Sequence, residues 1–150
     1  MDLARIRALL TLHEGCVPHA YQDSLGYWTI GIGHLIDKRK GGRLPDEIIV
    51  SLFEYDLRQV CKTLPEWAWR LDEVRLAVLI DMSFNLGPEP FNENGFKDWP
   101  KFVAQVKDGR YAEAAANMRS TLWATQVKGR ADRLATMMES GKWPSDLPNG

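Results

Sequence analysis

Beyond Pro45 the chain carries only helical patterns, which restricts it to folds in which helices dominate. Apolar residues there recur at spacings of three and four, and Pro or Gly interrupts the pattern between segments. The expected helices cover residues 45–64, 72–86, 100–107, 111–119 and 128–140. A chain of 150 residues fits one domain and is long enough to form a core without disulfide staples.

Upstream of these helices the sequence predicts one short helix and one hairpin. Asp2 is the expected N-cap of the helix and Gly15 its stop, so Glu14 falls in the last turn. The hairpin is expected as a strand over 21–23, a turn, and a strand over 27–34, with Arg43-Leu44 as one further short strand.

The second hairpin strand alternates between bulky residues and a set of small ones. Trp28, Ile30 and Ile32 are expected on its buried face, and Thr29 lies on the opposite face with two glycines. Glycines in a strand commonly mark a close approach by another backbone or by a ligand. These elements together predict an α+β fold, mostly α, with a small β-containing N-terminal lobe and a larger helical lobe joined by a long helix.

Composition and charge exclude several classes of protein. Apolar residues make up 45% and charged residues 26%, which excludes disordered and fibrous chains, and no apolar run is long enough for a membrane span or an export signal. The net charge of −1 predicts no polyanionic partner such as a nucleic acid. Residues 97–150 nevertheless carry 9 basic and 6 acidic side chains, a local excess of +3 that could hold an anionic polymer.

The most informative stretch places two carboxyl groups and a hydroxyl close together in the sequence. Glu14, Asp23 and Thr29 follow the spacing Glu-x8-Asp-x5-Thr. Cleavage of a glycosidic bond needs one protonated carboxyl group and one ionised one. The helix dipole and the neighbours Leu10 and Leu12 should favour the neutral form of Glu14, and a turn should keep Asp23 ionised. From spacing alone, an exposed Glu at a helix end and a turn-forming Asp are the more common explanation, because a Glu and an Asp this close together occur in most soluble proteins.

The same stretch resembles the active-site signature of the phage-type lysozymes, the muramidase endolysins of glycoside hydrolase family 24. That signature is a helix-end Glu followed by Gly, then Y-x-D-x-x-G-x-x-T-I-G-x-G-H, and every fixed position is matched by His13-Glu14-Gly15 and the run over 20–35. Weaker similarity continues through Phe84-Asn85, 112–115 and Trp123. The resemblance implies a lysozyme-like two-lobe fold, with a small lobe over about 14–60 and a helical lobe over about 61–150 that includes the N-terminal helix 2–14.

The resemblance also implies roles for individual residues. Glu14 matches the general acid, Asp23 the carboxylate that directs water, and Thr29 the residue that helps to hold this water. Arg130 matches an arginine that pairs with the general acid, and His34 and Asp56 match a structural ion pair. The residues that match the lining of the saccharide cleft are Gly31, Leu35, Phe84 and Asn85.

Two further residues and the cysteines have structural interpretations. Trp123 is expected in the core rather than as a sugar platform, and Asp81 is expected to be a structural acid with a hydrogen-bond partner. Cys16 and Cys61 are predicted to be free thiols. The resemblance implies no metal and no cofactor.

By resemblance, the chain is expected to be a monomeric endolysin that hydrolyses the β-1,4 bond between N-acetylmuramic acid and N-acetylglucosamine with inversion. It would remain in the host cytoplasm until a holin opens the membrane, without a cleaved signal, a membrane anchor or a separate wall-binding domain. The short connection from His34 to Pro45 predicts a shortened cleft. A rival in chemistry is a lytic transglycosylase, and a rival of another class is a cell-wall-binding module without activity.

Overall fold

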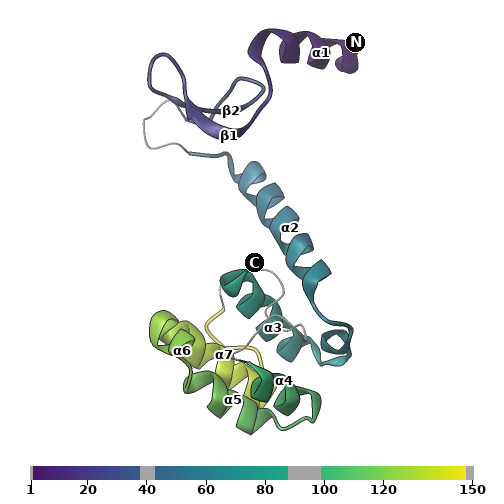
Figure 1. Cartoon of the computed structure of the whole chain (residues 1–150), viewed down its shortest axis with the longest axis vertical. Coiled ribbons are helices and arrows are strands. Elements are labelled where there is room, and N and C mark those ends of the chain that lie inside the picture. Colours follow the sequence, from purple (N-terminus) through teal and green to yellow (C-terminus); the bar gives the residue numbers. More distant parts are fainter. Residues whose placement is uncertain (1, 38–42, 88–98, 148–150) are drawn as a thin grey trace. The chain divides into compact units, whose positions relative to one another are not determined.

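The computed structural model describes residues 2–37, 43–87 and 99–147. The chain divides into two compact units, Met1–Phe53 and Glu54–Gly150, each described by itself below. Figure 1 shows the helices and the three-stranded sheet of the two units. Among the described residues, no helix is both long and apolar enough to cross a membrane. The predicted α+β class, mostly α, is confirmed.

The first unit contains one helix, one antiparallel sheet and the beginning of a second helix. Helix α1 (Leu3–Glu14) has the predicted ends, because the Asp2 carboxylate accepts the N–H of Arg5 and Gly15 closes the helix at φ 74°. The strands are β1 (Val17–Gln22), β2 (Trp28–Gly31) and β3 (His34–Leu35), in the order β1-β2-β3. Helix α2 (Asp46–Thr63) starts directly after Pro45, as predicted.

The prediction of a single strand over 27–34 is wrong, because the chain reverses within it. Gly31 and Gly33 have φ values of 66° and 62°, a conformation that side-chain-bearing residues avoid, and the turn between them directs β3 back along β2. The third strand is therefore His34–Leu35, and Arg43-Leu44 forms no strand. The turn expected at 38–42 lies outside the described residues.

The predicted burial of β2 is also wrong at Trp28 and Thr29, although Ile30 is half-buried. Thr29 is only 6% exposed, whereas Trp28 is 37% exposed. Thr29 lies in the middle of the sheet, paired with Tyr21 on one side and with Leu35 on the other. Trp28 pairs with Gln22 of β1, and its carbonyl oxygen accepts the N–H of Ile36 directly after β3 at 2.9 Å, so it too is bonded on both sides.

The second unit is helical and includes the predicted helices with small changes in their bounds. Besides the end of α2 it contains η1 (Glu66–Arg70), α3 (Glu73–Leu86), α4 (Pro100–Lys107), α5 (Tyr111–Arg119), α6 (Leu122–Val127) and α7 (Gly129–Ser140). The sequence did not predict η1 and α6, which are each less than two α-helical turns long. The loop expected after Gly87 lies outside the described residues.

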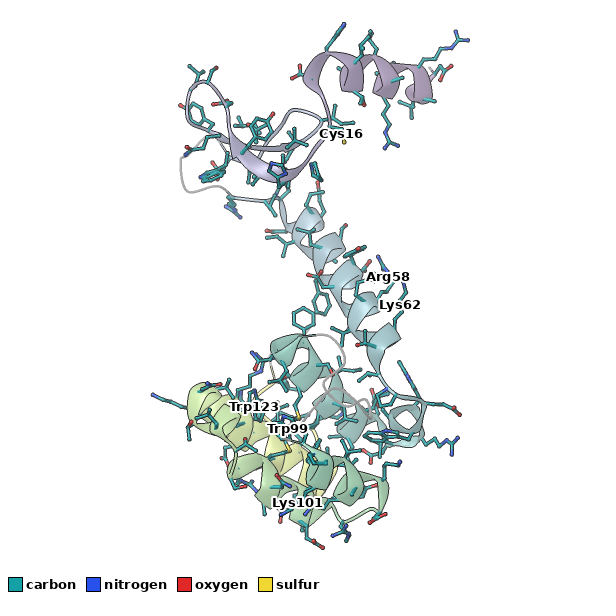
Figure 2. The ribbon with its side chains drawn as sticks, in the orientation of Figure 1. Cys16, Arg58, Lys62, Trp99, Lys101 and Trp123 are labelled. Atoms are coloured by element: carbon teal, nitrogen blue, oxygen red, sulfur yellow. The ribbon has the colours of Figure 1, made fainter. Side chains whose placement is uncertain are left out.

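The hydrophobic core of this unit lies between α3, α4, α5, α6 and α7. Its fully buried members include Leu79 and Met82 from α3, Phe102 from α4 and Met118 from α5. Trp99 packs edge to face against both Phe102 and Trp123, with ring centroids 5.3 and 5.7 Å apart (Figure 2). Trp123 is 6% exposed, so it belongs to the core as predicted.

Helix α1 and the two cysteines are more exposed. No residue of α1 is buried, and Leu3 and Leu12 are 66% and 78% exposed. The grouping of this helix with the helical lobe therefore stays a prediction. Cys16 and Cys61 are free thiols, in agreement with the sequence.

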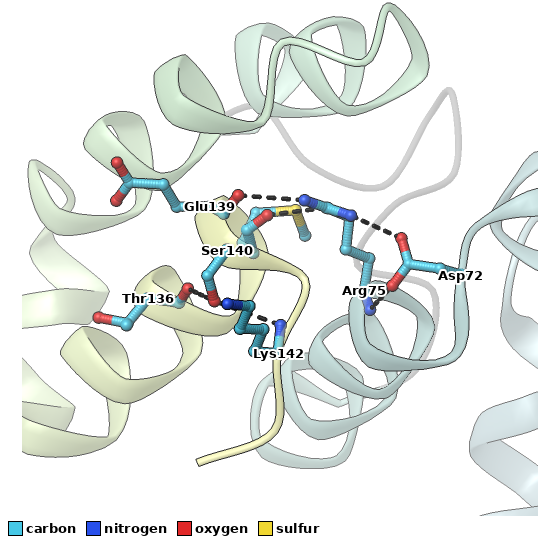
Figure 3. A network of polar contacts seen from close by, with 7 residues as sticks. Asp72, Arg75, Thr136, Glu139, Ser140 and Lys142 are labelled. Atoms are coloured by element: carbon cyan, nitrogen blue, oxygen red, sulfur yellow. Dashed lines mark hydrogen bonds and ion pairs between the residues drawn. The ribbon is translucent and has the colours of Figure 1, made fainter. Parts of the chain in front are cut away.

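Arg75 joins the start of α3 to the end of α7. Its guanidinium donates to the carbonyl oxygens of Met138 and Glu139, at 2.8 and 3.0 Å, and pairs with the Asp72 carboxylate at 2.7 Å (Figure 3). It also stacks 3.7 Å from the centroid of the Tyr111 ring. Burial raises the pKa of Asp72, but hydrogen bonds and the charge from Arg75 outweigh it and hold this pKa below its usual value.

Replacing Arg75 should therefore destabilise the helical unit. We expect Arg75→Met to lower the free energy of unfolding by about 2 kcal/mol, because it removes the side-chain donor of the carbonyl oxygens at the end of α7 and of the Asp72 Oδ2 atom. Urea denaturation followed by far-UV circular dichroism measures this change. Arg70→Met is the matched control, since the Arg70 side chain is 77% exposed and, among the described residues, forms an ion pair with Glu66 alone. Equal effects of the two substitutions would contradict this assignment.

Candidate functional site

Glu14 lies at the end of α1 with its carboxyl group against the backbone of Gly33. A Cβ atom built at Gly33 would come within 2.8 Å of the Glu14 Oε2 atom and 3.2 Å of its Cδ atom. Only glycine leaves this space, and the positive φ of Gly33 favours glycine as well. The group that comes close to Gly33 is the Glu14 side chain, not the backbone or ligand that the strand glycines predicted, and Gly33 was not among the site residues expected from the sequence.

The surroundings of Glu14 differ from the expected apolar ones. Leu10 and Leu12 are 48% and 78% exposed, and Glu14 itself is exposed. These leucines therefore do not remove water from the carboxyl group as predicted. Glu14 also makes no hydrogen bond or ion pair with the residues that the structure describes, so its carboxyl group remains open to solvent.

Asp23 begins the turn between β1 and β2 and is held by the backbone of that turn. Its Oδ1 atom accepts the N–H groups of Leu25 and Tyr27, both at 2.9 Å. Gly26, at φ 81°, closes the turn through an N–H donated to the Asp23 carbonyl. One carboxylate oxygen is therefore fixed by two donors, while Oδ2 makes no contact with the described residues.

Thr29 connects to Asp23 through a shared neighbour. The Thr29 hydroxyl donates to the carbonyl of Tyr27 at 3.5 Å, and the N–H of Tyr27 donates to Asp23. A single residue of the backbone thus positions both side chains. Asp23 and Thr29 thus lie in the same hairpin and share the backbone of Tyr27, and their cooperation stays a prediction.

The residues predicted to line a saccharide cleft lie in both units. In the first unit, Gly31 has open space where a side chain would begin, with no atom within 4 Å, and Leu35 is 41% exposed beside Thr29. In the second unit, Phe84 is 43% exposed and Asn85 follows it near the end of α3. All four leave surface available to a ligand.

Two polar contacts join α3 to the segments that follow α5. Arg130 donates from Nε to the Asp81 carboxylate at 2.8 Å and from Nη2 to the Asp81 carbonyl at 3.2 Å, which supplies the partner expected for Asp81. Trp123 donates from Nε1 to the Asn85 Oδ1 atom at 2.8 Å. No sequence pattern indicates the second contact, because its residues are 38 positions apart.

Two predicted pairs join residues of different units and stay predictions. They are the pairing of Arg130 with Glu14 and the ion pair between His34 and Asp56. Within residues 2–37, 43–87 and 99–147, no group of three or more His, Cys, Asp or Glu side chains is arranged to hold a metal ion.

Comparisons with known proteins point to one family. A family model described as phage lysozyme matches residues 11–138. "Probable T4-type lysozyme 1" of Dictyostelium discoideum is 29% identical over 93% of this chain and 96% of the relative. The pre-baseplate central spike protein Gp5 of Enterobacteria phage T4 is 26% identical over 91% of this chain and 28% of that protein. Peptidoglycan hydrolase gp36 of Enterobacteria phage SP6 is 30% identical over 64% of this chain and 10% of that protein.

The contact between Glu14 and Gly33 can be tested with one methyl group. Gly33→Ala should displace the Glu14 carboxyl group and reduce clearing of chloroform-treated Gram-negative cells roughly tenfold to a hundredfold. Gly109→Ala is the matched control, because Gly109 has a similar φ of 72° and open space at its side-chain position. Both should lose about 1–2 kcal/mol of unfolding free energy to backbone strain. Equal clearing rates for the two variants would show that Glu14 does not need this space.

Proposed function

Because the chain belongs to the phage lysozyme family, we propose that it hydrolyses the β-1,4 bond between N-acetylmuramic acid and N-acetylglucosamine in peptidoglycan, with inversion. Family membership makes the chain a glycoside hydrolase of the lysozyme type. The bond, the stereochemistry and the roles of individual residues are our proposal. The observation that carries it is the hairpin in which one residue, Tyr27, holds both Asp23 and Thr29.

In this mechanism Glu14 donates its proton to the oxygen of the leaving sugar. Asp23 orients the attacking water through Oδ2, since Oδ1 is occupied by two backbone donors. Thr29 helps to hold the same water with its hydroxyl oxygen. An inverting hydrolase keeps its two carboxyl groups roughly 6.5–9.5 Å apart to admit the water. As the bond breaks, the leaving oxygen takes the proton of Glu14, and the water loses a proton to Asp23 as it attaches to the anomeric carbon.

The remaining predicted residues take supporting roles. We propose that Gly31, Leu35, Phe84 and Asn85 contact the glycan strand, and that Arg130 pairs with Glu14 in the free enzyme. Asp81 already binds Arg130 through two contacts, so this arginine has a fixed alternative partner. We keep His34 and Asp56 as a structural pair.

The biological role is proposed by the same reasoning. The chain acts as a monomeric endolysin that reaches the wall after a holin opens the membrane, and it needs no cofactor. The similarity to a phage spike protein shows that lysozyme-type sequences also occur in other assemblies. Host-cell lysis is therefore the part of this proposal that needs a lysis assay.

Product analysis distinguishes hydrolysis from lytic transglycosylation. We expect digestion of peptidoglycan in ¹⁸O-labelled water to place one heavy oxygen at the new reducing end of muramic acid, because water is the nucleophile. Mass spectrometry measures this label, and proton NMR at early times should show the α-anomer. An unlabelled anhydro product, lighter by one water, would establish the transglycosylase instead.

Removal of the proposed acid distinguishes an enzyme from a binding module. Glu14→Gln should reduce hydrolysis roughly a hundredfold or more while the protein stays folded. Glu139→Gln is the matched control, since Glu139 also lies in the last turn of an α-helix and is partly exposed. If the wild-type chain and Glu14→Gln clear cells at the same slow rate, the binding module is the better description.

The hydroxyl of Thr29 can be removed without changing the shape of the side chain. Thr29→Val should lower kcat roughly tenfold, because the proposed water loses one of its partners, and should leave the unfolding free energy nearly unchanged. Thr63→Val is the control, since the Thr63 hydroxyl also bonds only to a nearby carbonyl, that of Val60. Unchanged kcat in Thr29→Val would remove this hydroxyl from the mechanism.

A further inference from the structure

Lys128 connects two helices and has a backbone conformation that lysine avoids. In the part of the chain that the structure describes, it is the only residue other than glycine with a positive φ. Its φ of 46° and ψ of −112° are those of the first central residue of a type II′ turn, a position that glycine dominates. For a residue with a Cβ atom, a backbone of this kind is disfavoured roughly five- to thirtyfold relative to an ordinary one.

The glycine that could adopt this conformation without strain lies one position later. Gly129 is the first residue of α7 and has no positive φ. A Cβ atom built on it would meet no atom within 4 Å, so neither its backbone nor its surroundings require glycine. Glycine in a helix is unfavourable relative to alanine. The strained position and an unconstrained glycine are therefore neighbours, in the order opposite to the one that the observed turn favours.

The strain at Lys128 has a cause in how α6 and α7 are attached to α3. Trp123 of α6 donates to Asn85 at 2.8 Å. Arg130 of α7 donates to the carboxylate and the carbonyl of Asp81, at 2.8 and 3.2 Å. These two acceptors lie one turn apart on α3, so both helices are fixed to neighbouring points of one element. Only Lys128 separates α6 from α7, and a single residue must then supply the whole change of direction.

The backbone of Lys128 bonds to both helices at once. Its N–H donates to the Ala124 carbonyl at 2.9 Å, and its carbonyl accepts the N–H of Asp132 at 3.3 Å, which is the first bond of α7. The bond to Asp132 is longer than the common length of about 2.9–3.0 Å. The Lys128 side chain makes no capping hydrogen bond to α7. The first turn of α7, which carries Arg130, is therefore the weaker side of this connection.

We propose that Lys128 is a positioning residue that determines how readily Arg130 leaves Asp81. In the observed state Lys128 is strained and Arg130 binds Asp81. In a second state the positive φ passes to Gly129, which then ends α6 as its C-terminal glycine, and Lys128 becomes an ordinary helical residue. The bond from Asp132 to Lys128 is lost, the first turn of α7 unwinds, and Arg130 is released. Relief of the strain offsets part of the lost bonding, so release is more frequent than the contacts alone indicate.

This inference rests on the proposed function in one respect. In that proposal Arg130 pairs with Glu14 in the free enzyme, and an arginine that is bound to Asp81 is withheld from this pair. Lys128 thus acts on the reaction only through Arg130. Its effect on the release of Arg130 is a property of the helical unit alone and can be measured without substrate.

Hydrogen exchange at the Arg130 Nε–H group measures this release. ¹H–¹⁵N NMR of the full chain gives the exchange rate, and Arg130→Lys identifies the signal by its absence. Lys128→Gly should slow the exchange about five- to thirtyfold, because glycine removes the strain of the observed state and disfavours the helical residue of the second. Gly129→Ala should also slow it, because alanine suits the start of α7 and avoids the positive φ of the second state.

Two control variants exclude simpler explanations. Lys128→Met removes the charge but keeps the strain, so it should keep the wild-type exchange rate. Lys142→Gly makes the same substitution beside another glycine, at an exposed lysine without positive φ, and should also keep this rate. Thermal unfolding identifies any variant that is not folded. Lys128→Gly should unfold at no lower temperature than Lys128→Met, whereas Lys142→Gly should unfold at a lower temperature than the wild type.

The outcomes distinguish this inference from the proposed function. Unchanged exchange in Lys128→Gly, or equal slowing in Lys128→Met, would overturn the inference. Lys128→Gly and Gly129→Ala should also clear chloroform-treated Gram-negative cells at least about threefold more slowly than Lys142→Gly, because less Arg130 is released. Slowed exchange with equal clearing rates would overturn the positioning role and leave the proposed hydrolysis intact. Slowed exchange in a chain that hydrolyses no peptidoglycan would overturn the proposed function and leave the control of Arg130 by Lys128 standing.

Discussion

The helical unit depends on the burial of one side of α3. Val78, Leu79 and Met82 on this side are essentially inaccessible and belong to the core formed with α4, α5 and α7. Burial of side chains of this size contributes about 1.5–3 kcal/mol each, more than any single polar contact at the surface. The position of α3 is therefore set by its apolar side, and the polar residues on its other side are carried into place with it.

Polar contacts then fix how α3 is rotated about its own axis and how its ends are held. They are not needed for the helix to form. Arg75 holds the N-terminal turn to the end of α7, and Asp81 and Asn85 receive donors from Arg130 and Trp123. Asp81 and Asn85 are four residues apart and share one face of α3, whereas Arg75, six residues before Asp81, lies on a different face near the start of the helix. A helix fixed in this way keeps the exposed residues Phe84 and Asn85 in defined positions near its C-terminal end.

The sequence predicts the helices well and the hairpin only in part. Caps such as Asp2 and Asp72 and stops such as Gly87 are local signals, so α1 and α3 have nearly the predicted bounds. The alternation of bulky and small residues that predicts a strand continues through the turn from Gly31 to Gly33 and conceals it. Glycine alone does not reveal that both positions adopt positive φ.

The site residues, too, can be predicted from the sequence only where their contacts are local in the chain. A contiguous pattern identifies Glu14, Asp23 and Thr29, and the contacts within 23–29 are local enough to follow from turn chemistry. The role of Gly33 depends on where the end of α1 places a side chain, and the bond between Trp123 and Asn85 depends on how three helices pack. Neither is encoded in any short stretch of sequence.

The two proposed catalytic carboxyl groups are held in different ways, and the difference suits their separate tasks. Asp23 has one oxygen fixed by two backbone donors, which gives a constant direction to the oxygen that must orient water. Glu14 contacts the backbone of Gly33 and has no donor among the described residues, so its proton can exchange with solvent between turnovers. In the helical unit the charge of Arg130 is balanced by the Asp81 carboxylate, whose oxygen lies 2.8 Å from its Nε atom.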